Sequence, residues 1–281
     1  MIQNSSIIDR FLSTLSVVSR IPIKLRFKFD PSRMDFYLPI TGIFPALLGL
    51  LLYAIGSLFL NFPDALVVIF ILIAQYLGFN LFHLDGLMDT ADAFLGSADK
   101  EKRLLILKDS RIGVYGFFSG VTVLGLKAAL LYSLFPFARN FPALVFAYPL
   151  WGRFSAALIP CMVKPLNPDS LGALAKDSRP LRCIFGMALA LLLWTLPIQG
   201  LCNALPFFGI PTTASMNEIL FAAIITALCL CVISPLVALY YARLYRNSLG
   251  GYTGDALGAA IETTEVLCGL AALAVLLITF I

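Results

Sequence analysis

Three aspartates in one short stretch have the spacing of a chemical site. Asp85, Asp89 and Asp92 recur at i, i+4 and i+7, so on a helix their carboxylates project from one face, within about 60° of arc. Like charges at this spacing repel one another, and a divalent cation would balance them. Hard carboxylate oxygens suit Mg²⁺. The stretch therefore predicts a metal or phosphate site, and the plainer alternative is a solvated acidic face paired with basic side chains.

A second acidic group lies near the C-terminus. Asp255, Glu262 and Glu265 would also share one side of a helix. We predict that these three carboxylates join the three aspartates as metal ligands; the alternative is a small-residue packing face with carboxylates that reach toward water. The residues just before them could let the backbone approach a substrate closely: Gly251, Thr253 and Gly254.

A polar stretch between the two acidic groups carries basic residues. Lys108 and Arg111 could neutralise phosphate charge, and Asp109 and Ser110 between them are predicted to contact substrate. The alternative is an ordinary basic flank of a membrane span with a local Asp–Arg pair. Arg153 lies in an apolar segment, where a charged side chain must face protein or water. It could pair with an acidic group or contact substrate.

His83 is the only histidine in the chain, so a histidine-based zinc site is not expected. It stands two residues before Asp85 and could serve as a general base or as a donor to phosphate. A hydrogen-bonded histidine at a helix end is the alternative. The sequence has no phosphate-binding loop, no dinucleotide-binding glycine pattern and no CxxC pair.

The amino-acid composition predicts which kind of secondary structure positions these residues. Of the 281 residues, 60% are hydrophobic and 13% charged, against roughly 25% charged in a soluble domain, so a bilayer is the expected solvent. We predict an all-α, polytopic helical bundle with about seven membrane spans, forming a single domain over 1–281. The predicted spans are Phe36–Leu60, Ala65–Leu84, Phe117–Pro136, Phe141–Val163, Cys183–Gly200, Ile219–Tyr241 and Thr263–Ile281.

The distribution of Lys and Arg predicts the orientation. The segments on one side of these spans hold 17 of the 20 basic residues, and those on the other side hold one. By the positive-inside rule the N-terminus is then cytoplasmic, in a bacterial or archaeal cytoplasmic membrane. The connection 85–116, which carries the three aspartates, is expected on the cytoplasmic side.

The N-terminal segment 1–35 combines apolar residues with basic ones. One interpretation is an amphipathic helix on the surface of an anionic bilayer. The other is a cytoplasmic lid packed on the bundle.

Two classes of function fit this arrangement. One is a Mg²⁺-dependent transferase that acts on a phosphorylated substrate. The other is a cation-coupled transporter with carboxylates inside the membrane. The acidic groups are predicted at the ends of spans, beside a polar connection, and this position favours the enzyme.

Three sequence blocks together resemble the cobalamin synthase family, the adenosylcobinamide-GDP ribazoletransferases. The blocks run His83 to Asp92, Lys108 to Gly113 and Gly250 to Ala259, the last followed by Glu262 and Glu265. They occur in the family's order, and the length and polytopic character fit the whole chain. A CDP-alcohol phosphotransferase is the alternative enzyme, but its Asp-Gly-x-x-Ala-Arg pattern is absent, since Asp85-Gly86 is followed by Leu87-Met88-Asp89-Thr90.

The resemblance implies a late step of cobalamin biosynthesis. The substrates would be adenosylcobinamide-GDP and α-ribazole or its 5′-phosphate, and the products adenosylcobalamin or its 5′-phosphate and GMP. Mg²⁺ would be the cofactor and membrane lipid the surroundings, with no nucleic acid partner and the formation of a homo-oligomer left open. The residues expected to carry catalysis are His83, Asp85, Asp89, Asp92, Lys108 and Arg111.

Overall fold

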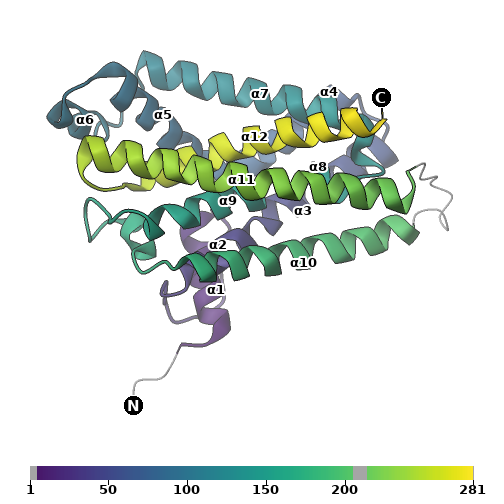
Figure 1. The fold of residues 1–281 in the computed structure, drawn as a ribbon, viewed down its shortest axis with the longest axis horizontal. Coiled ribbons are helices and arrows are strands. Elements are labelled where there is room, and N and C mark those ends of the chain that lie inside the picture. The colour runs from purple at the N-terminus through teal and green to yellow at the C-terminus, as the bar shows by residue number, and fades with distance from the viewer. Residues whose placement is uncertain (1–4, 205–213, 281) are drawn as a thin grey trace.

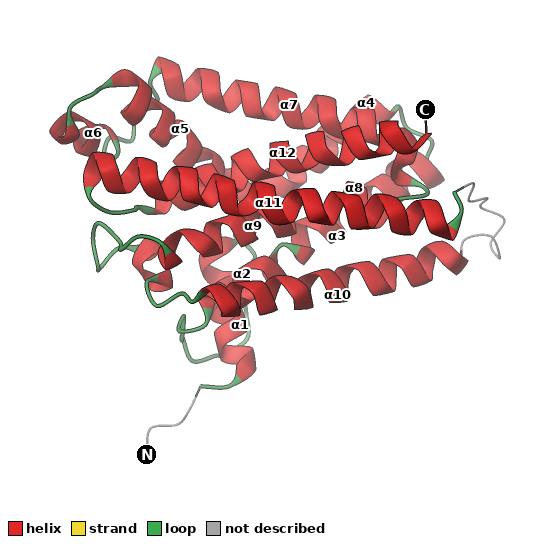
Figure 2. Ribbon diagram, in the orientation of Figure 1, coloured by secondary structure: helices red, strands yellow, loops and turns green. Residues whose placement is uncertain are grey.

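The chain is all-helical wherever its structure is described. The computed structural model describes residues 5–204 and 214–280, and these ranges contain helices and loops but no strand (Figure 2). The longest helices run side by side along the long axis of the molecule, with the loops gathered at the two ends (Figure 1). The predicted all-α class is therefore confirmed.

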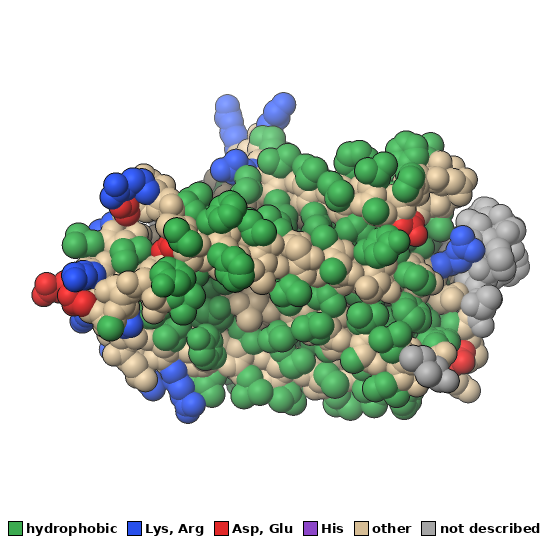
Figure 3. Space-filling view, turned by 90° about the horizontal axis from the view of Figure 1, so that it is seen from above, with side chains coloured by type: hydrophobic (Ala, Val, Ile, Leu, Met, Phe, Trp, Pro, Cys, Tyr) green, Lys and Arg blue, Asp and Glu red, His purple; other side chains and the backbone are tan. Residues whose placement is uncertain are grey.

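Within the described residues, seven helical segments are long and apolar enough to cross a membrane, which confirms the predicted number. They match the predicted spans in order: Met34–Phe59, Asp64–Gly96, Val114–Ala138, Pro142–Cys161, Pro180–Cys202, Asn217–Leu249 and Gly254–Phe280. On one face of the molecule, hydrophobic side chains cover most of the middle and acidic side chains lie near the two ends (Figure 3). The protein is thus a multi-pass membrane protein.

The first span is interrupted by a glycine. Helices α2 (Met34–Thr41) and α3 (Ile43–Tyr53) meet at Gly42, where a Cβ atom would lie 2.7 Å from the backbone of Leu150. Leu150 belongs to α9 (Tyr148–Leu158), a helix whose residues are all buried. The missing side chain therefore lets the first span pass close to the centre of the bundle.

The second span extends further than predicted. Helix α4 (Asp64–Gln75) continues through a π-helical turn, η2 (Tyr76–Asn80), into α5 (Leu81–Gly96). The helix continues about three turns past Leu84, the predicted end of the span, because α5 keeps packing on other helices beyond that point. The three aspartates are therefore fixed on a helix. The rest of the expected connection contains α6 (Lys100–Ile106) and a short loop before α7 (Val114–Ala138).

The last span begins earlier than predicted, at Gly254 and not at Thr263. The preceding helix α11 (Met216–Leu249) ends at Gly250, whose positive φ of 93° is readily adopted by glycine and closes the helix. The chain then enters α12 (Gly254–Phe280), so Asp255 and Glu262 both lie inside a helix. Helix α12 packs against α5, α7, α9 and α11, and so occupies the middle of the bundle.

The remaining elements complete the outside of the bundle. Helix α10 (Pro180–Ala204) packs on α2 and α9, and a short α8 (Pro142–Val145) leads into α9. Two 3₁₀ turns, η3 (Ile159–Cys161) and η4 (Leu171–Ala175), lie in the connection between α9 and α10.

The N-terminal helix α1 (Ile7–Val18) has two different faces. It starts with a capping box, in which the Ser6 hydroxyl accepts from the Asp9 backbone N–H at 3.1 Å. Leu15 and Val18 are buried and the helix packs on α2, whereas Ile7 and Ile8 are exposed. The lid interpretation therefore accounts for the buried face, and contact of the exposed face with lipid stays a prediction.

Candidate active site

A cavity of about 570 Å³ lies at the end of the bundle that carries α6. Most of its polar lining comes from the predicted blocks: His83 and Asp85 on α5, Lys108 after α6, and Thr253 and Asp255 beside the start of α12. Asn167 and Ser170, in the connection before α10, also line it. Much of its apolar lining comes from α1, α2, the region of α6 and the connection before α10, through Val17, Val18, Met34, Leu38, Leu104, Leu107, Leu166 and Leu171. Phe82, Ala156, Leu257 and Ile261 complete it from α5, α9 and α12. The cavity can therefore hold a ligand that is charged on one side and apolar on the other.

Glycines bring the two acidic groups together across α5 and α12. A Cβ at Gly86 would lie 2.9 Å from the Cα of Asp255, and a Cβ at Gly258 would lie 2.8 Å from the carbonyl oxygen of His83. Both neighbours are backbone atoms, which cannot move aside as a side chain can. The two helices thus pack backbone to backbone, and this contact sets Asp85 opposite Asp255.

The carboxylates of the cavity lack a basic partner. Asp85 is exposed, Asp89 and Asp255 are half-buried, and none of the three forms an ion pair within the described residues. Asp85 and Asp255 lie close enough to act on Asp89 through their charge. Asp255 accepts one hydrogen bond, from the Thr253 hydroxyl at 2.9 Å. This concentration of carboxylate oxygens is of the kind that binds divalent cations.

The donor set fits Mg²⁺ in its chemistry. In the described part of the chain, no three His, Cys, Asp or Glu side chains converge closely enough to hold one ion as they are placed. Mg²⁺ in phosphate-transfer sites is commonly bound by one or two carboxylates and completes its octahedral shell with water and substrate phosphate oxygens. Asp85, Asp89 and Asp255 could supply those carboxylates.

Asp92 is used differently from its two neighbours on α5. Its carboxylate oxygens accept from the backbone N–H groups of Gly113 and Gly116, each at 2.8 Å. A Cβ at either glycine would collide with this carboxylate. Asp92 therefore anchors the start of α7, and the metal-ligand role predicted for it stays a prediction.

The stretch before α7 is an exposed loop. Arg111 and Asp109 form an ion pair, with Nη2 and Oδ2 2.6 Å apart, and the hydrogen bonds from Arg111 lower the pKa of the Asp109 carboxyl to about 2. Lys108 lines the cavity, and Ser110 is exposed beside it. Of these four residues, Lys108 is the one that the structure brings to the predicted site directly.

The loop before α12 is held by its neighbour in space. The Leu166 N–H donates to the Tyr252 carbonyl at 2.8 Å, and the Tyr252 N–H donates to the Lys164 carbonyl at 3.0 Å. A Cβ at Gly251 would meet the Leu166 backbone at 2.8 Å. Gly251 therefore serves loop packing, whereas Gly254 lines the cavity with open space beside it.

Glu262 and Glu265 do not line this cavity. They lie deeper in α12 and contact Lys127 and Arg153, so the structure divides the six predicted metal ligands into separate groups. Lys127, Asn80 and Tyr76 complete this buried cluster and were not among the predicted site residues. The sequence feature that could have predicted this cluster is Lys127, a charged residue inside an apolar span.

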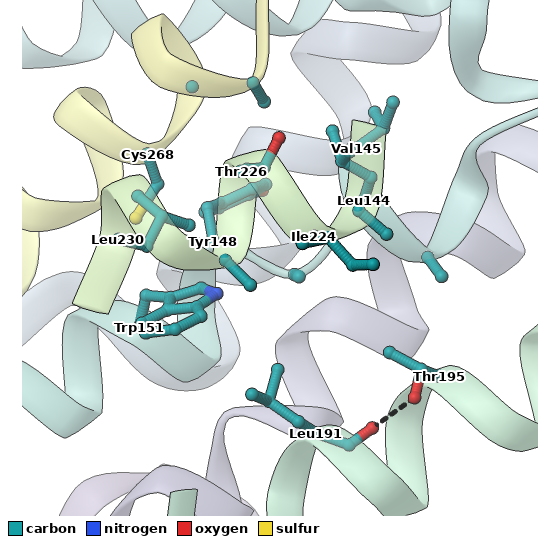
Figure 4. A pocket seen from close by; sticks show the side chains of 16 residues that line it. Leu144, Val145, Tyr148, Trp151, Leu191, Thr195, Ile224, Thr226, Leu230 and Cys268 are labelled. Carbon is teal, nitrogen blue, oxygen red and sulfur yellow. Dashed lines mark hydrogen bonds between the residues drawn. The ribbon is translucent and has the colours of Figure 1, made fainter. Parts of the chain in front are cut away.

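A second cavity, of about 300 Å³, lies among α8 to α12 (Figure 4). Tyr148, Trp151, Leu191 and Ile224 belong to its lining, which holds no acidic or basic side chain. It therefore offers nothing that could hold a metal or a phosphate, and the first cavity is the candidate active site.

Comparison with known proteins agrees with this geometry. Residues 10–274 match the model of the cobalamin-5-phosphate synthase family. Proteins named adenosylcobinamide-GDP ribazoletransferase are similar over nearly the whole chain. The one from Thermosipho melanesiensis is 30% identical over 91% of this chain and 94% of its own length. The one from Vibrio cholerae serotype O1 is 32% identical over 96% of this chain and 95% of its own length. The one from Clostridium botulinum is 28% identical over 93% of this chain and 96% of its own length.

No solved structure matches the chain at a significant level. The family match covers all three blocks that line or adjoin the candidate active site, from His83 to Glu265. The chain therefore belongs to the cobalamin-5-phosphate synthase family.

Proposed function

We propose that this protein joins adenosylcobinamide-GDP to α-ribazole, or to its 5′-phosphate, and releases GMP. The names of its relatives supply the substrates. The observation that carries the proposal onto this chain is the cavity lined by Asp85, Asp255 and Lys108, with Asp89 close to both aspartates. Within the described residues, none of these three carboxylates forms an ion pair. That is the charge pattern expected around a metal-bound diphosphate.

The reaction we propose exchanges one phosphate ester bond for another. A ribose hydroxyl of α-ribazole attacks the phosphorus on the cobinamide side of the diphosphate, the bond from that phosphorus to the bridging oxygen breaks, and GMP leaves with that oxygen. Mg²⁺, when bound, would supply positive charge that offsets the negative charge developing on the leaving group. The residues that would hold it are Asp85, Asp89 and Asp255.

The other residues of the cavity have distinct parts in this proposal. The Lys108 ammonium neutralises a phosphate oxygen at the mouth of the cavity. The proton of the attacking hydroxyl passes to a carboxylate or to His83, whose Nδ1 atom is buried without a hydrogen-bond partner and whose side chain lines the cavity. The apolar walls from α1, α2 and α6 contact the uncharged parts of the substrates.

We further propose that the site faces the cytoplasm of a bacterial or archaeal cell. The cavity is lined by residues of the segments between spans that hold most Lys and Arg, and such segments stay on the cytoplasmic side. Charged nucleotide substrates would then reach it without crossing the membrane.

Purified protein in detergent or nanodiscs tests the proposal directly. We expect GMP release from adenosylcobinamide-GDP plus α-ribazole, dependent on Mg²⁺ and absent when α-ribazole is left out. Release of CMP from a CDP-alcohol would instead support the phosphotransferase alternative. Substrate flux into sealed vesicles without GMP release would support a transporter.

A further inference from the structure

A second polar cluster lies in the interior of the bundle and is not explained by the proposed chemistry. Lys127 on α7 places its Nζ atom 2.6 Å from Glu262 Oε2 and 2.6 Å from Glu265 Oε2. Arg153 on α9 places Nη1 3.5 Å from Glu265 Oε1, and its Nη2 donates to Asn80 Oδ1 at 3.0 Å. We call Lys127, Arg153, Glu262 and Glu265 the interior charge cluster.

The cluster is closed to solvent and balanced in charge. The four side chains are between 0% and 5% exposed, and they comprise two cations and two anions. An unpaired charge in the interior of a membrane bundle is costly, so each of these groups depends on the presence of the others. The balance means that the cluster needs no further ion.

The carboxylate oxygens of the cluster all have donors. Glu262 Oε2 accepts from Lys127 and from the Tyr76 hydroxyl at 2.6 Å, and Oε1 accepts from the Asn80 amide at 3.4 Å. Both Glu265 oxygens accept from the same amide, at 3.2 and 3.3 Å, in addition to their cations. A metal ion could reach these oxygens only by displacing Lys127 or Asn80.

The cluster connects the helices that build the active site. Both glutamates lie on α12, Lys127 on α7, and Asn80 at the junction of η2 and α5. Glu262 is seven residues beyond Asp255, about 10 Å along the helix axis. The same α5 and α12 carry Asp85 and Asp255 into the cavity. The cluster therefore holds both helices against α7 two turns away from the reacting groups.

We propose that Lys127 and Arg153 are positioning residues, which neutralise Glu262 and Glu265 so that these glutamates fix α12 against α5, α7 and α9 and do not ligate the metal. This assignment replaces the metal-ligand role that the sequence suggests for the two glutamates. The ionic part of the inference stands on the contacts alone, and its consequence for turnover rests on the proposed function.

The proposal is tested by comparing a single substitution that unbalances the charges of the cluster with a double substitution that restores the balance. Lys127→Met leaves two buried carboxylates facing one arginine. Lys127→Met combined with Glu262→Gln leaves one carboxylate facing one arginine, so the charges balance again. We expect the single variant to lower the melting temperature in detergent on the order of 10 °C, and the double variant to recover at least about half of that loss. Lys102→Met, a change of an exposed lysine on α6, is the matched control and should leave the melting temperature unaltered.

Turnover and metal dependence separate positioning from ligation. We expect kcat for GMP release to be about tenfold higher in the double variant than in Lys127→Met, with the Mg²⁺ concentration for half-maximal rate within about twofold of the parent protein. We also expect Mg²⁺ to raise the melting temperature of the parent protein, and this rise should persist in Glu262→Gln.

Two results would overturn the proposal. One is a double variant no more stable than Lys127→Met, and the other is a Glu262→Gln variant that loses its thermal response to Mg²⁺. If the parent protein releases no GMP, the proposed function fails, but the melting temperatures still decide whether the charges are paired.

Discussion

Two sets of carboxylates, one shared between α5 and α12 and the other on α12 alone, have opposite surroundings. At the end of the bundle, Asp85, Asp89 and Asp255 line or adjoin a cavity and have no basic partner among the described residues. In the interior, Glu262 and Glu265 are fully buried and are held by Lys127 and Arg153. All five side chains are carboxylates, and Glu262 lies only two turns beyond Asp255 on α12. The comparison teaches that the surroundings of a carboxylate, more than its position in a motif, decide whether it is free to bind a ligand.

Removing a negative charge beside the cavity should have the largest effect on the rate of GMP release. We expect Asp89→Asn to lower GMP release at least about 100-fold, because it removes a candidate oxygen ligand from the centre of the unpaired group. The variant should stay folded, since it relieves repulsion between like charges. The assay is initial GMP release at saturating Mg²⁺, with the melting temperature as the control for folding. A near-normal rate would show that Asp89 is not a metal ligand. It would also weaken the contrast between the carboxylates at the cavity and those in the interior.

Separating the helices that carry both sets should come next. Gly86→Ala places a Cβ against the Asp255 backbone, so we expect about 1–3 kcal/mol of destabilisation and a loss of turnover. Gly125→Ala on α7 is the matched control, because a Cβ there has no neighbour within 4 Å. Unfolding midpoints and GMP release of the two variants make the comparison. Equal behaviour of both would show that the close approach of α5 to α12 does not position the site.

A third carboxylate on α5 should behave as a structural one. Asp92→Asn replaces a carboxylate that accepts from two backbone N–H groups, so we expect a stability loss of about 1–2 kcal/mol. Turnover should fall much less than in Asp89→Asn, and the Mg²⁺ concentration for half-maximal rate should stay the same. If that concentration rises about tenfold, Asp92 belongs with the metal ligands after all.

The exposed pair beside the cavity should matter least for stability. The pKa of Asp109 is lowered to about 2, so the stability that this pair contributes is present above the ordinary carboxyl pKa near 4 and is lost as pH falls through about 2. Because the pair is exposed, Asp109→Asn should shift the melting temperature by no more than about 1 °C at pH 7. A larger shift at pH 7 would show that the loop is a rigid part of the site.

The number of spans and the helical placement of the three aspartates could be predicted from the sequence, because a bilayer restricts the length and polarity of a spanning helix. Apolar runs of membrane length predict all seven spans, and spacing at i, i+4 and i+7 places three aspartates on one side of a helix. The ends of spans were less predictable. Polarity marks where a chain leaves the lipid but not where a helix stops, so α5 and α12 extend past the expected limits.

The partners of charged residues could not be predicted. Helical angle places Glu262 and Glu265 on the side of α12 that bears Asp255, but depth along the axis and cations from other helices decide their role. Lys127 and Asn80 come from distant parts of the sequence, and only packing brings them to the glutamates. In the same way, the two backbone donors to Asp92 come from the start of α7, more than twenty residues away.

Binding of Mn²⁺ as a substitute for Mg²⁺ tests the contrast between the two sets most directly. The measurement is a titration of the purified protein followed by the electron paramagnetic resonance of free Mn²⁺, on the parent protein, on Asp85→Asn combined with Asp255→Asn, and on Lys127→Met combined with Glu262→Gln. Our account predicts affinity at least about tenfold weaker in the first pair of substitutions and unchanged in the second. Weakened binding in the second pair with normal binding in the first would contradict it.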